Sequence, residues 1–339
     1  MSEPNEFLER LRHAGHVHRR DARLTALSGG VSSDIYLVED GPNRFVVKRA
    51  LSKLRVKDDW TADIRRNTTE REYLECVSRL VPDTVPRVLF ADPEGDYFAM
   101  EYLDARCENW KRQLLSGIFL VAHAQAAGRV LGEIHRRTAG DGALRKQFDT
   151  TENFHQLRTA PYLLTTGERH PALREFFVAE AQRIEHTREC LVHGDFSPKN
   201  ILVEPARLVL LDCEVAWYGD PAFDVAFLLN HFFLKRLYHA PRGRKLTELI
   251  RAFWQGYIAS NTDVRADIEA RVARLLPLLL LARVDGKSPV EYLDPPRATR
   301  VRAFALTRIP GEPISLNALI QAWFAHTECV TPALRSDED

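Results

Sequence analysis

Two polar residues, Asp195 and Asn200, lie five positions apart and are suited to act together in catalysis. They belong to the segment HGDFSPKNILV, residues 193–203, in which an apolar run follows Asn200 directly. Such a run favours a buried strand, which would hold the end of the loop and aim both side chains at one point. A carboxylate can accept the proton of a hydroxyl, and an amide oxygen is a hard, neutral ligand that suits Mg²⁺. The pair therefore indicates phosphoryl transfer to a hydroxyl, with Asp195 as the base.

The same interval separates the catalytic Asp of protein kinases from an Asn that binds magnesium. A second acidic pair, Asp212 and Glu214, follows at the end of the next apolar run, where phosphoryl-transfer enzymes hold a further metal ligand. If this segment is extended, Glu214 points to the same side as Asp212, because side chains alternate along a strand. We therefore expect ATP and Mg²⁺ as cofactors, with Asn200, Asp212 and Glu214 as the metal ligands.

The elements that must position these residues differ between two parts of the chain. Up to Glu101, short β-like runs separated by turn residues occupy 23–27, 31–39, 44–49, 86–91 and 97–100, and helices are predicted at 5–19 and 61–80. Beyond it, helical spacing covers 120–138, 171–188 and most of 221–324, with short strands at 201–203 and 208–211. The sequence therefore predicts an α+β fold, with a small antiparallel sheet in residues 1–101 and a mostly helical part in residues 102–330. Residues 331–339 are expected to form a disordered tail.

Taken together, HGDFSPKN and the later segment LLDCEVAWYGDPAFDVAFLL resemble the aminoglycoside phosphotransferase and choline kinase family. The resemblance covers most of the chain and is most specific between residues 193 and 229. It implies a two-lobed fold similar to that of protein kinases, in which residues 1–101 bind the nucleotide and residues 102–330 carry catalysis and substrate binding. The Asp-x-Glu form of Asp212 and Glu214 is similar to the 5-methylthioribose kinases of this family, whereas Asn200 departs from them.

The resemblance also assigns residues of the N-terminal part to the nucleotide. Lys48 matches the strand lysine that pairs with the α- and β-phosphates. Glu72 matches the helix glutamate that orients this lysine, with Glu70 as the rival for that role. The loop that covers the phosphates falls on Gly29, Gly30 and Ser32, and the hinge that binds adenine falls on Glu101 and Leu103. The last two would bind adenine through their main chain.

Residues around the catalytic loop admit structural as well as functional roles. Within the resemblance, His193 holds the shape of the loop and Asp224 braces its main chain. Asp220 followed by a proline is typical of a helix N-cap. Lys199 either reaches the γ-phosphate as a second catalytic residue or is solvated, and both readings stay open.

Two further segments are candidates for contact with the acceptor. Trp217 and Tyr218 are interpreted as lining its pocket, because they follow the metal segment directly, with burial in the core as the alternative. Residues 283–289 place polar side chains after an apolar helix. They either cap that helix, with Gly286 as its terminator, or contact the substrate.

The acceptor is expected to be a small molecule. Only eight residues separate Asp212 from the helix start at Pro221, which leaves no room for the long segment on which protein kinases present a peptide. Between Pro221 and Pro310, Lys and Arg number 15 and Asp and Glu number 8, the opposite of what a pocket for polycationic aminoglycosides requires. A sugar, cyclitol or amino alcohol is favoured. An aminoglycoside phosphotransferase and a catalytically silent nucleotide-binding module are the alternatives.

Composition narrows the protein class further. Lys and Arg together number 47, as do Asp and Glu, so nothing calls for nucleic acid or an anionic membrane as a partner. The N-terminus lacks the apolar stretch of a signal peptide, and the apolar run at 275–281 is far shorter than the about 20 residues of a membrane span. The five cysteines form no CxxC pair, which argues against a disulfide framework and a zinc cluster. We expect a cytoplasmic enzyme that is a monomer or a homodimer.

Overall fold

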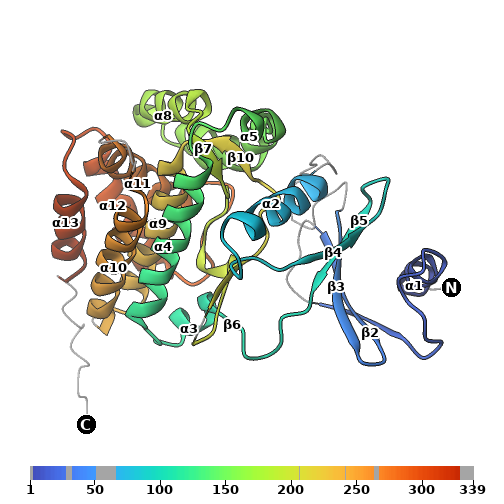
Figure 1. Ribbon diagram of the computed structural model, residues 1–339. Coiled ribbons are helices and arrows are strands. Elements are labelled where there is room, and N and C mark those ends of the chain that lie inside the picture. Colours follow the sequence, from blue (N-terminus) through green and yellow to red (C-terminus); the bar gives the residue numbers. More distant parts are fainter. Residues whose placement is uncertain are drawn as a thin grey trace, which may run out of the picture. The chain divides into compact units, whose positions relative to one another are not determined.

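The computed structural model describes residues 3–27, 33–50, 66–205, 207–240, 242–262 and 267–328. The chain divides into two compact units. Unit 1 comprises residues 1–108 and 202–216, and unit 2 comprises residues 109–201 and 217–339. The predicted α+β class is confirmed, since both a main antiparallel sheet and a large set of helices are present (Figure 1). The predicted division after Glu101 stays a prediction, and the predicted tail at 331–339 lies outside the described residues.

Unit 1 is built around a five-stranded antiparallel sheet. Its strands, in spatial order, are β1 (Arg23–Ala26), β2 (Ser33–Asp40), β3 (Asn43–Ala50), β5 (Tyr97–Glu101) and β4 (Val88–Ala91). Its helices are α1 (Glu3–His13) and α2 (Arg66–Leu80). A second sheet has the order β6 (Glu108–Asn109), β8 (Ile201–Val203) and β9 (Leu208–Leu210).

The two faces of the main sheet in unit 1 have different neighbours. Phe7 and Leu11 of α1 share a core with Phe45 and Val47 of β3. Because side chains alternate along a strand, Lys48 lies on the opposite face of β3. That face is the one toward α2, which contacts β3. The alternation therefore directs Lys48, which follows the apolar residues 45–47, toward α2, the helix that carries Glu70 and Glu72.

Unit 2 is mostly helical. Its α-helices are α3 (Trp110–Leu115), α4 (Val121–Thr138), α5 (Gly142–Gln147), α6 (Thr151–Phe154), α7 (Thr165–Arg169), α8 (Arg174–His186), α9 (Pro221–Tyr238), α10 (Lys245–Ser260), α11 (Ile268–Asp285), α12 (Pro295–Arg308) and α13 (Leu316–Glu328). A π-helix, η1, spans His155–Leu164, and short 3₁₀ helices span Pro171–Leu173 (η2), Pro198–Asn200 (η3) and Arg242–Arg244 (η4). The strands β7 (Cys190–Val192) and β10 (Trp217–Gly219) pair in antiparallel fashion.

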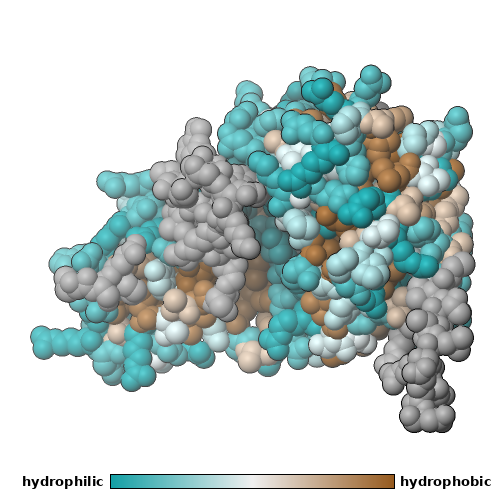
Figure 2. Space-filling model, turned by 180° about the vertical axis from the view of Figure 1, so that it is seen from behind, coloured by the Kyte–Doolittle hydropathy of each residue, from teal (hydrophilic) through white to brown (hydrophobic). Residues whose placement is uncertain are grey.

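The core of unit 2 includes α9, which is buried from Pro221 to Leu237. Asp220 is its N-cap and accepts a hydrogen bond from the N–H of Ala222, as predicted. The apolar run 275–281 is buried within α11. Hydrophilic residues cover most of the face shown in Figure 2, with apolar residues in patches among them. Within the described ranges, no helix combines the length and the apolar character that a membrane span needs.

Candidate active site

The loop that carries Asp195 follows the buried strand β7 and ends in the 3₁₀ helix η3. Gly194 has a φ of 75°, in the left-handed region that glycine adopts at little cost. The carboxylate of Asp224 accepts hydrogen bonds from the N–H groups of His193 at 2.7 Å and Gly194 at 3.0 Å. The N–H of Asp195 donates to Nδ1 of His193 at 3.2 Å. The predicted structural roles of Asp224 and His193 are therefore confirmed.

The carboxylate of Asp195 is only 3% exposed and contacts two cations. Its Oδ2 lies 2.9 Å from a guanidinium nitrogen of Arg158 and 3.0 Å from Nζ of Lys199. Arg158 also donates through Nε to the main-chain oxygen of Gly194 at 2.6 Å. These cations offset the cost of burying a carboxylate in the interior. Arg158 comes from η1 and was not predicted, because a single arginine far from the catalytic loop in sequence carries no motif.

Asn200 lies at the far end of the same loop. Its Nδ2 donates to the main-chain oxygen of Asp195 at 3.1 Å, so its side-chain oxygen is the atom suited to act as a hard ligand. The main-chain oxygen of Lys199 accepts a hydrogen bond from Nδ2 of Asn109 at 2.7 Å. Three of the predicted site residues, Asp195, Lys199 and Asn200, are thus brought together in one loop of unit 2.

A second ionisable group lies within unit 1 and centres on the buried Lys48. Its Nζ is 2.5 Å from a carboxylate oxygen of Glu70 and 2.7 Å from one of Asp212. The predicted pairing of Lys48 with Glu72 is therefore wrong, and the rival Glu70 is the partner. Helix geometry explains the difference, because two positions along a helix rotate a side chain by about 200°. Glu70 shares the buried face of α2 with Leu74, whereas Glu72 is only partly buried.

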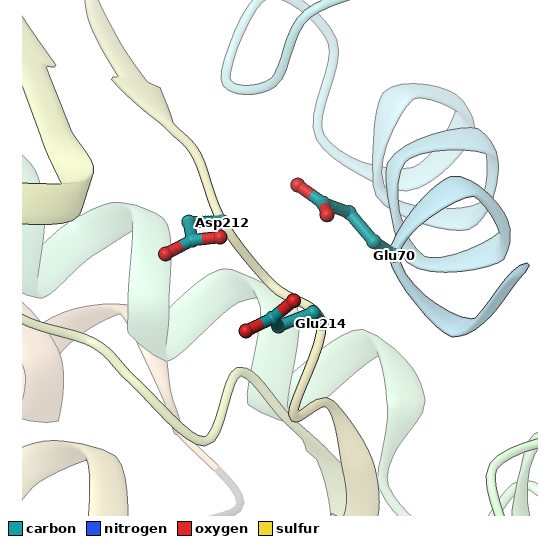
Figure 3. A group of neighbouring side chains, drawn as sticks. All are labelled: Glu70, Asp212 and Glu214. Carbon is teal, nitrogen blue, oxygen red and sulfur yellow. The ribbon is translucent and has the colours of Figure 1, made fainter. Parts of the chain in front are cut away.

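The carboxylates of Glu70, Asp212 and Glu214 point toward a common space (Figure 3). One oxygen of each lies within 4.8 Å of the others, which suits a divalent cation held by hard oxygen ligands. Asp212 and Glu214 come from the irregular segment after β9, and the φ of Asp212 is 59°. Alternation along a strand is therefore the wrong reason for their common direction. The segment is not a strand, and its main chain is left-handed at Asp212.

The cluster of Glu70, Asp212 and Glu214 carries more negative charge than its cationic neighbours offset. Lys48 contacts two of the three carboxylates, and Nε of Arg66 lies 3.2 Å from Glu214. Burial raises the pKa of Glu70 to about 7, the other two carboxylates add to this rise, and Lys48 opposes it. Burial lowers the pKa of Lys48, but the three carboxylates outweigh burial and raise that pKa well above its ordinary value. Three carboxylates against two cations favour the binding of a further positive charge.

The predicted hinge lies at the end of β5. The N–H of Glu101 donates to the main-chain oxygen of Arg87 at 2.9 Å. Its carboxylate accepts hydrogen bonds from Arg87 at 2.8 Å and Arg207 at 2.9 Å. Leu103 follows outside regular secondary structure, and the adenine-binding role of this segment stays a prediction. The phosphate-covering loop with Gly29, Gly30 and Ser32 lies outside the described residues.

A cavity of about 190 Å³ lies within unit 2, and both Asp195 and Lys199 line it. Other lining residues come from α3, η1, α9 and the segment after α11. Within residues 283–289, Arg283, Ser288 and Pro289 line the cavity, while Gly286 is the C-cap of α11. The segment therefore both ends a helix and borders the cavity.

Trp217 and Tyr218 have a different environment from the one predicted. Both are buried in β10. The ring of Trp217 stacks on Phe154 with centroids 4.2 Å apart, and the hydroxyl of Tyr218 donates to the main-chain oxygens of Thr138 and Glu189. The pocket role is therefore wrong and the core alternative holds. Position after the metal segment was not informative, because β10 turns inward to pair with β7.

Known proteins resemble this chain over most of its length. A model of the phosphotransferase enzyme family matches residues 23–268. The methylthioribose kinase of Pectobacterium atrosepticum is 27% identical, over 77% of this chain and 76% of that protein. The methylthioribose kinase of Bacillus cereus is 23% identical, over 73% of this chain and 70% of that protein.

Solved structures share the fold at low sequence identity. An amicoumacin kinase solved with AMP-PNP and Ca²⁺ has a TM-score of 0.54 and 13% identity, covering 93% of this chain and 98% of that one. An aminoglycoside phosphotransferase from Alicyclobacillus acidocaldarius has a TM-score of 0.51 and 14% identity, covering 90% and 92%. The predicted kinase-like fold is therefore confirmed.

Proposed function

The chain belongs to the phosphotransferase enzyme family, and we propose that it transfers the γ-phosphate of ATP to a hydroxyl of a small molecule. The observation that carries the proposal is that Asp195, a buried carboxylate, lines the cavity of unit 2. An acceptor in this cavity presents its hydroxyl to Asp195, which accepts the proton as the oxygen bonds to phosphorus. Lys199 is the second catalytic residue, because its Nζ lies 3.0 Å from Asp195 and its charge offsets that of the transferred group.

In this proposal, unit 1 binds the nucleotide. Lys48 is held by Glu70 and pairs with the α- and β-phosphates. The main chain of Glu101 and Leu103 binds adenine, and the loop of Gly29, Gly30 and Ser32 covers the phosphates. The buried Lys48–Glu70 pair supports this reading. Lysine is almost never fully buried unless it is paired, and this pair holds the ammonium of Lys48 in place.

Magnesium fits the residues that are present. Asp212 and Glu214 offer hard oxygen donors in a cluster that carries excess negative charge, and the oxygen of Asn200 is of the same kind. We assign the ion to Asn200, Asp212 and Glu214. When bound, Mg²⁺ offsets the charge of the phosphates.

The acceptor is proposed to be a sugar, a cyclitol or an amino alcohol. The relatives named methylthioribose kinase make a ribose-type sugar the first acceptor to test. The small cavity supports a compact molecule, because its 190 Å³ is below the about 300–1,000 Å³ of sites for drug-sized ligands.

The test is release of ADP from ATP and Mg²⁺ across a panel of acceptors. The panel contains methylthioribose and other sugars, cyclitols, amino alcohols and aminoglycosides, and Asp195→Asn serves as the blank. We expect release that depends on an acceptor and falls about 10²–10⁴-fold in the variant, the usual contribution of a general base.

Two outcomes would overturn the proposal. ATP binding without ADP release on any acceptor would point to a silent nucleotide-binding module. Equal rates for the wild type and Asp195→Asn would remove Asp195 from the chemistry. A clear preference for aminoglycosides would keep phosphotransfer and change the acceptor class.

A further inference from the structure

We propose that the acceptor carries an anionic group, a carboxylate or a phosphate, which binds at Lys235 and Arg283 while a hydroxyl of the same molecule faces Asp195. The inference rests on the proposed function and names the substrate class of its site. It follows from the charge of the cavity, which neither the family match nor the named relatives explain.

The cavity is lined by more cations than carboxylates. Its cationic residues are Lys111, Lys199, Lys235 and Arg283, and its acidic residues are Asp195 and Glu291. Each carboxylate already has a lysine partner: Asp195 lies 3.0 Å from Lys199, and Glu291 lies 2.5 Å from Lys111. Among the residues that the structure describes, no carboxylate forms an ion pair with either of the two remaining cations. Two cationic side chains of the cavity lining, Lys235 and Arg283, are therefore left for a ligand.

Lys235 is the more unusual of these two cations. It lies on α9, has 0% exposure and lines the cavity. Its Nζ lies 4.7 Å from the centre of the Tyr292 ring and 3.4 Å from the hydroxyl of that residue. A buried ammonium that contacts an aromatic ring, and no carboxylate of the described residues, costs free energy unless a ligand anion binds beside it. In sequence, the signal is a single lysine after the long apolar run of α9.

Arg283 approaches the same space from the last turn of α11. It is 9% exposed and bonds neutral groups, the hydroxyl of Tyr162 at 3.2 Å and Oγ of Ser288 at 2.9 Å. Its Nε is buried and has no hydrogen-bond partner in the described part of the chain, and the same is true of Nδ1 of His231. Both residues line the cavity. Nε of Arg283 is a donor, and Nδ1 of His231 is a donor in the tautomer that carries its proton there, so a ligand that accepts hydrogen bonds would satisfy both atoms.

The pKa shifts of two residues that line the cavity agree with this reading. Burial lowers the pKa of Lys235 to about 7, and the charges of Lys111 and Arg283 lower it further while Glu291 opposes them. Burial and the surrounding cations also lower the pKa of His231 well below its ordinary value. A bound anion would raise the pKa of both residues, because it favours their charged forms. The titratable and charged groups around Lys235 are Lys111, Lys199, His231, Arg283, Glu291 and Tyr292.

The same charges exclude a class of acceptors. A polycationic aminoglycoside or a quaternary amine would have to enter beside Lys235 and Arg283 without a carboxylate to receive it. The small volume of the cavity excludes large anions. Among the proposed acceptors, a compact sugar or cyclitol that carries a carboxylate or a phosphate fits these charges, and an amino alcohol does not.

The test compares matched acceptors that differ only in one substituent, at constant ionic strength. One set is glycerol, glycerate, glycerol 3-phosphate and serinol, and another is glucose, glucuronate, glucose 6-phosphate and glucosamine. ADP release gives kcat/KM for each, and a thermal shift of the protein gives binding without turnover. We expect the carboxylate or the phosphate member of a set to bind best. The comparison of these two members tells which of the two anions the site prefers.

The variants are Lys235→Met and Arg283→Met, and the control is Lys245→Met, which removes an exposed charge of α10 outside the cavity. Loss of one charged hydrogen-bond donor should weaken binding of the anionic member about 10- to 100-fold, and so remove its advantage over the neutral member of the same set. Lys245→Met should bind both as the wild type does.

The outcomes separate the inference from the proposed function. Binding of an anion that depends on Lys235, without ADP release, would contradict the proposed function and leave the anion site at Lys235 and Arg283 standing. The inference would be overturned if the neutral or amine members bound as well as the anions. It would also be overturned if anion binding survived both Lys235→Met and Arg283→Met. Because methionine is similar in length to lysine and carries no buried charge, Lys235→Met should fold, and its melting curve checks this.

Discussion

Glu70 and Glu72 are two positions apart on α2, and only Glu70 contacts Lys48. The resemblance favoured Glu72 and left Glu70 as the rival, because the motif alone does not fix which of two nearby glutamates faces the strand. The phase of the helix decides, and that phase depends on which residues of α2 pack inward. Asp195 and Asn200 were easier to predict, because they share one short loop in which Nδ2 of Asn200 bonds the main-chain oxygen of Asp195. Arg158 and Lys235 were missed, since their importance comes from partners that are distant in sequence.

The two glutamates of α2 provide a matched test of the nucleotide site. Glu70→Gln removes the charge that holds Lys48, and we expect it to weaken ATP binding about 10-fold or more, as for loss of a charged hydrogen bond. Glu72→Gln on the same helix should bind ATP within about twofold of the wild type. Titration calorimetry with an ATP analogue measures both. Equal losses in the two variants would contradict the assignment of Glu70.

A second prediction at this scale concerns pH and the stability of the fold. The pKa of Lys235 is about 7 in the folded protein, against an ordinary value of 10.5. Between these two values the unfolded chain binds more protons at this residue than the folded chain does. The contribution of Lys235 to stability therefore rises with pH across that window and is least favourable below it.

Lys235→Met removes this unfavourable contribution. The variant should gain more in melting temperature over the wild type at about pH 7 than at about pH 9.5. Thermal denaturation at both pH values, without ligand, measures the difference. An equal gain in melting temperature at both pH values, or a loss at the lower pH, would show that burial does not lower the pKa of Lys235.

At the scale of elements, periodicity predicted the long helices and the strands of the main sheet. α4, α9 and α11 and the strands β1 to β5 all appear where apolar spacing places them. The π-helix η1 was not predicted, because Pro161 lies inside it and a proline within a helical pattern is typical of a helix end. Its absence from the prediction matters, since η1 supplies Arg158 to the catalytic loop.

Helices α4 and α10 lie side by side (Figure 1) and approach closely at glycines. A Cβ added to Gly128 would lie 2.1 Å from the main-chain oxygen of Phe253, and one added to Gly256 would lie 2.5 Å from that of Gln125. Main-chain atoms cannot move aside without shifting a helix. The pairing of these helices thus depends on residues with no side chain.

Gly128→Ala should therefore destabilise the protein by about 1–3 kcal/mol, the usual cost of overpacking. The control is Gly142→Ala at the start of α5, where an added Cβ meets nothing within 4 Å. Alanine there should be neutral or stabilise the helix by up to about 1 kcal/mol. Urea denaturation compares the two, and a stable Gly128→Ala variant would contradict the close packing.

At the scale of the whole molecule, the sequence did not reveal that unit 1 is discontinuous. Residues 202–216 belong to it although they follow the catalytic loop. Long-range contacts explain this: the N–H of Leu210 donates to Thr84, and Sγ of Cys213 contacts the main-chain oxygen of Glu70. Such pairings cannot be derived from local pattern. They carry Asp212 and Glu214 to Glu70.

Metal dependence follows from the carboxylate cluster that this chain path creates. ATP with Mg²⁺ should raise the melting temperature more than ATP with EDTA, because ligand binding to the folded state stabilises it. Asp212→Ala should abolish the difference between the two conditions. The control Asp149→Asn changes an exposed carboxylate outside the cluster and should behave as the wild type. A Mg²⁺ effect that persists in Asp212→Ala would place the ion elsewhere.

The most direct measurement follows the label from ATP in the presence of an acceptor found by ADP release. With γ-labelled ATP, the account predicts label on the small acceptor, none on the protein, and a rate about 10²–10⁴-fold lower in Asp195→Asn. With α-labelled ATP, it predicts no label on either. Label on the protein, transfer from the α position, or an unchanged rate in Asp195→Asn would contradict a small-molecule kinase that uses Asp195 as its base.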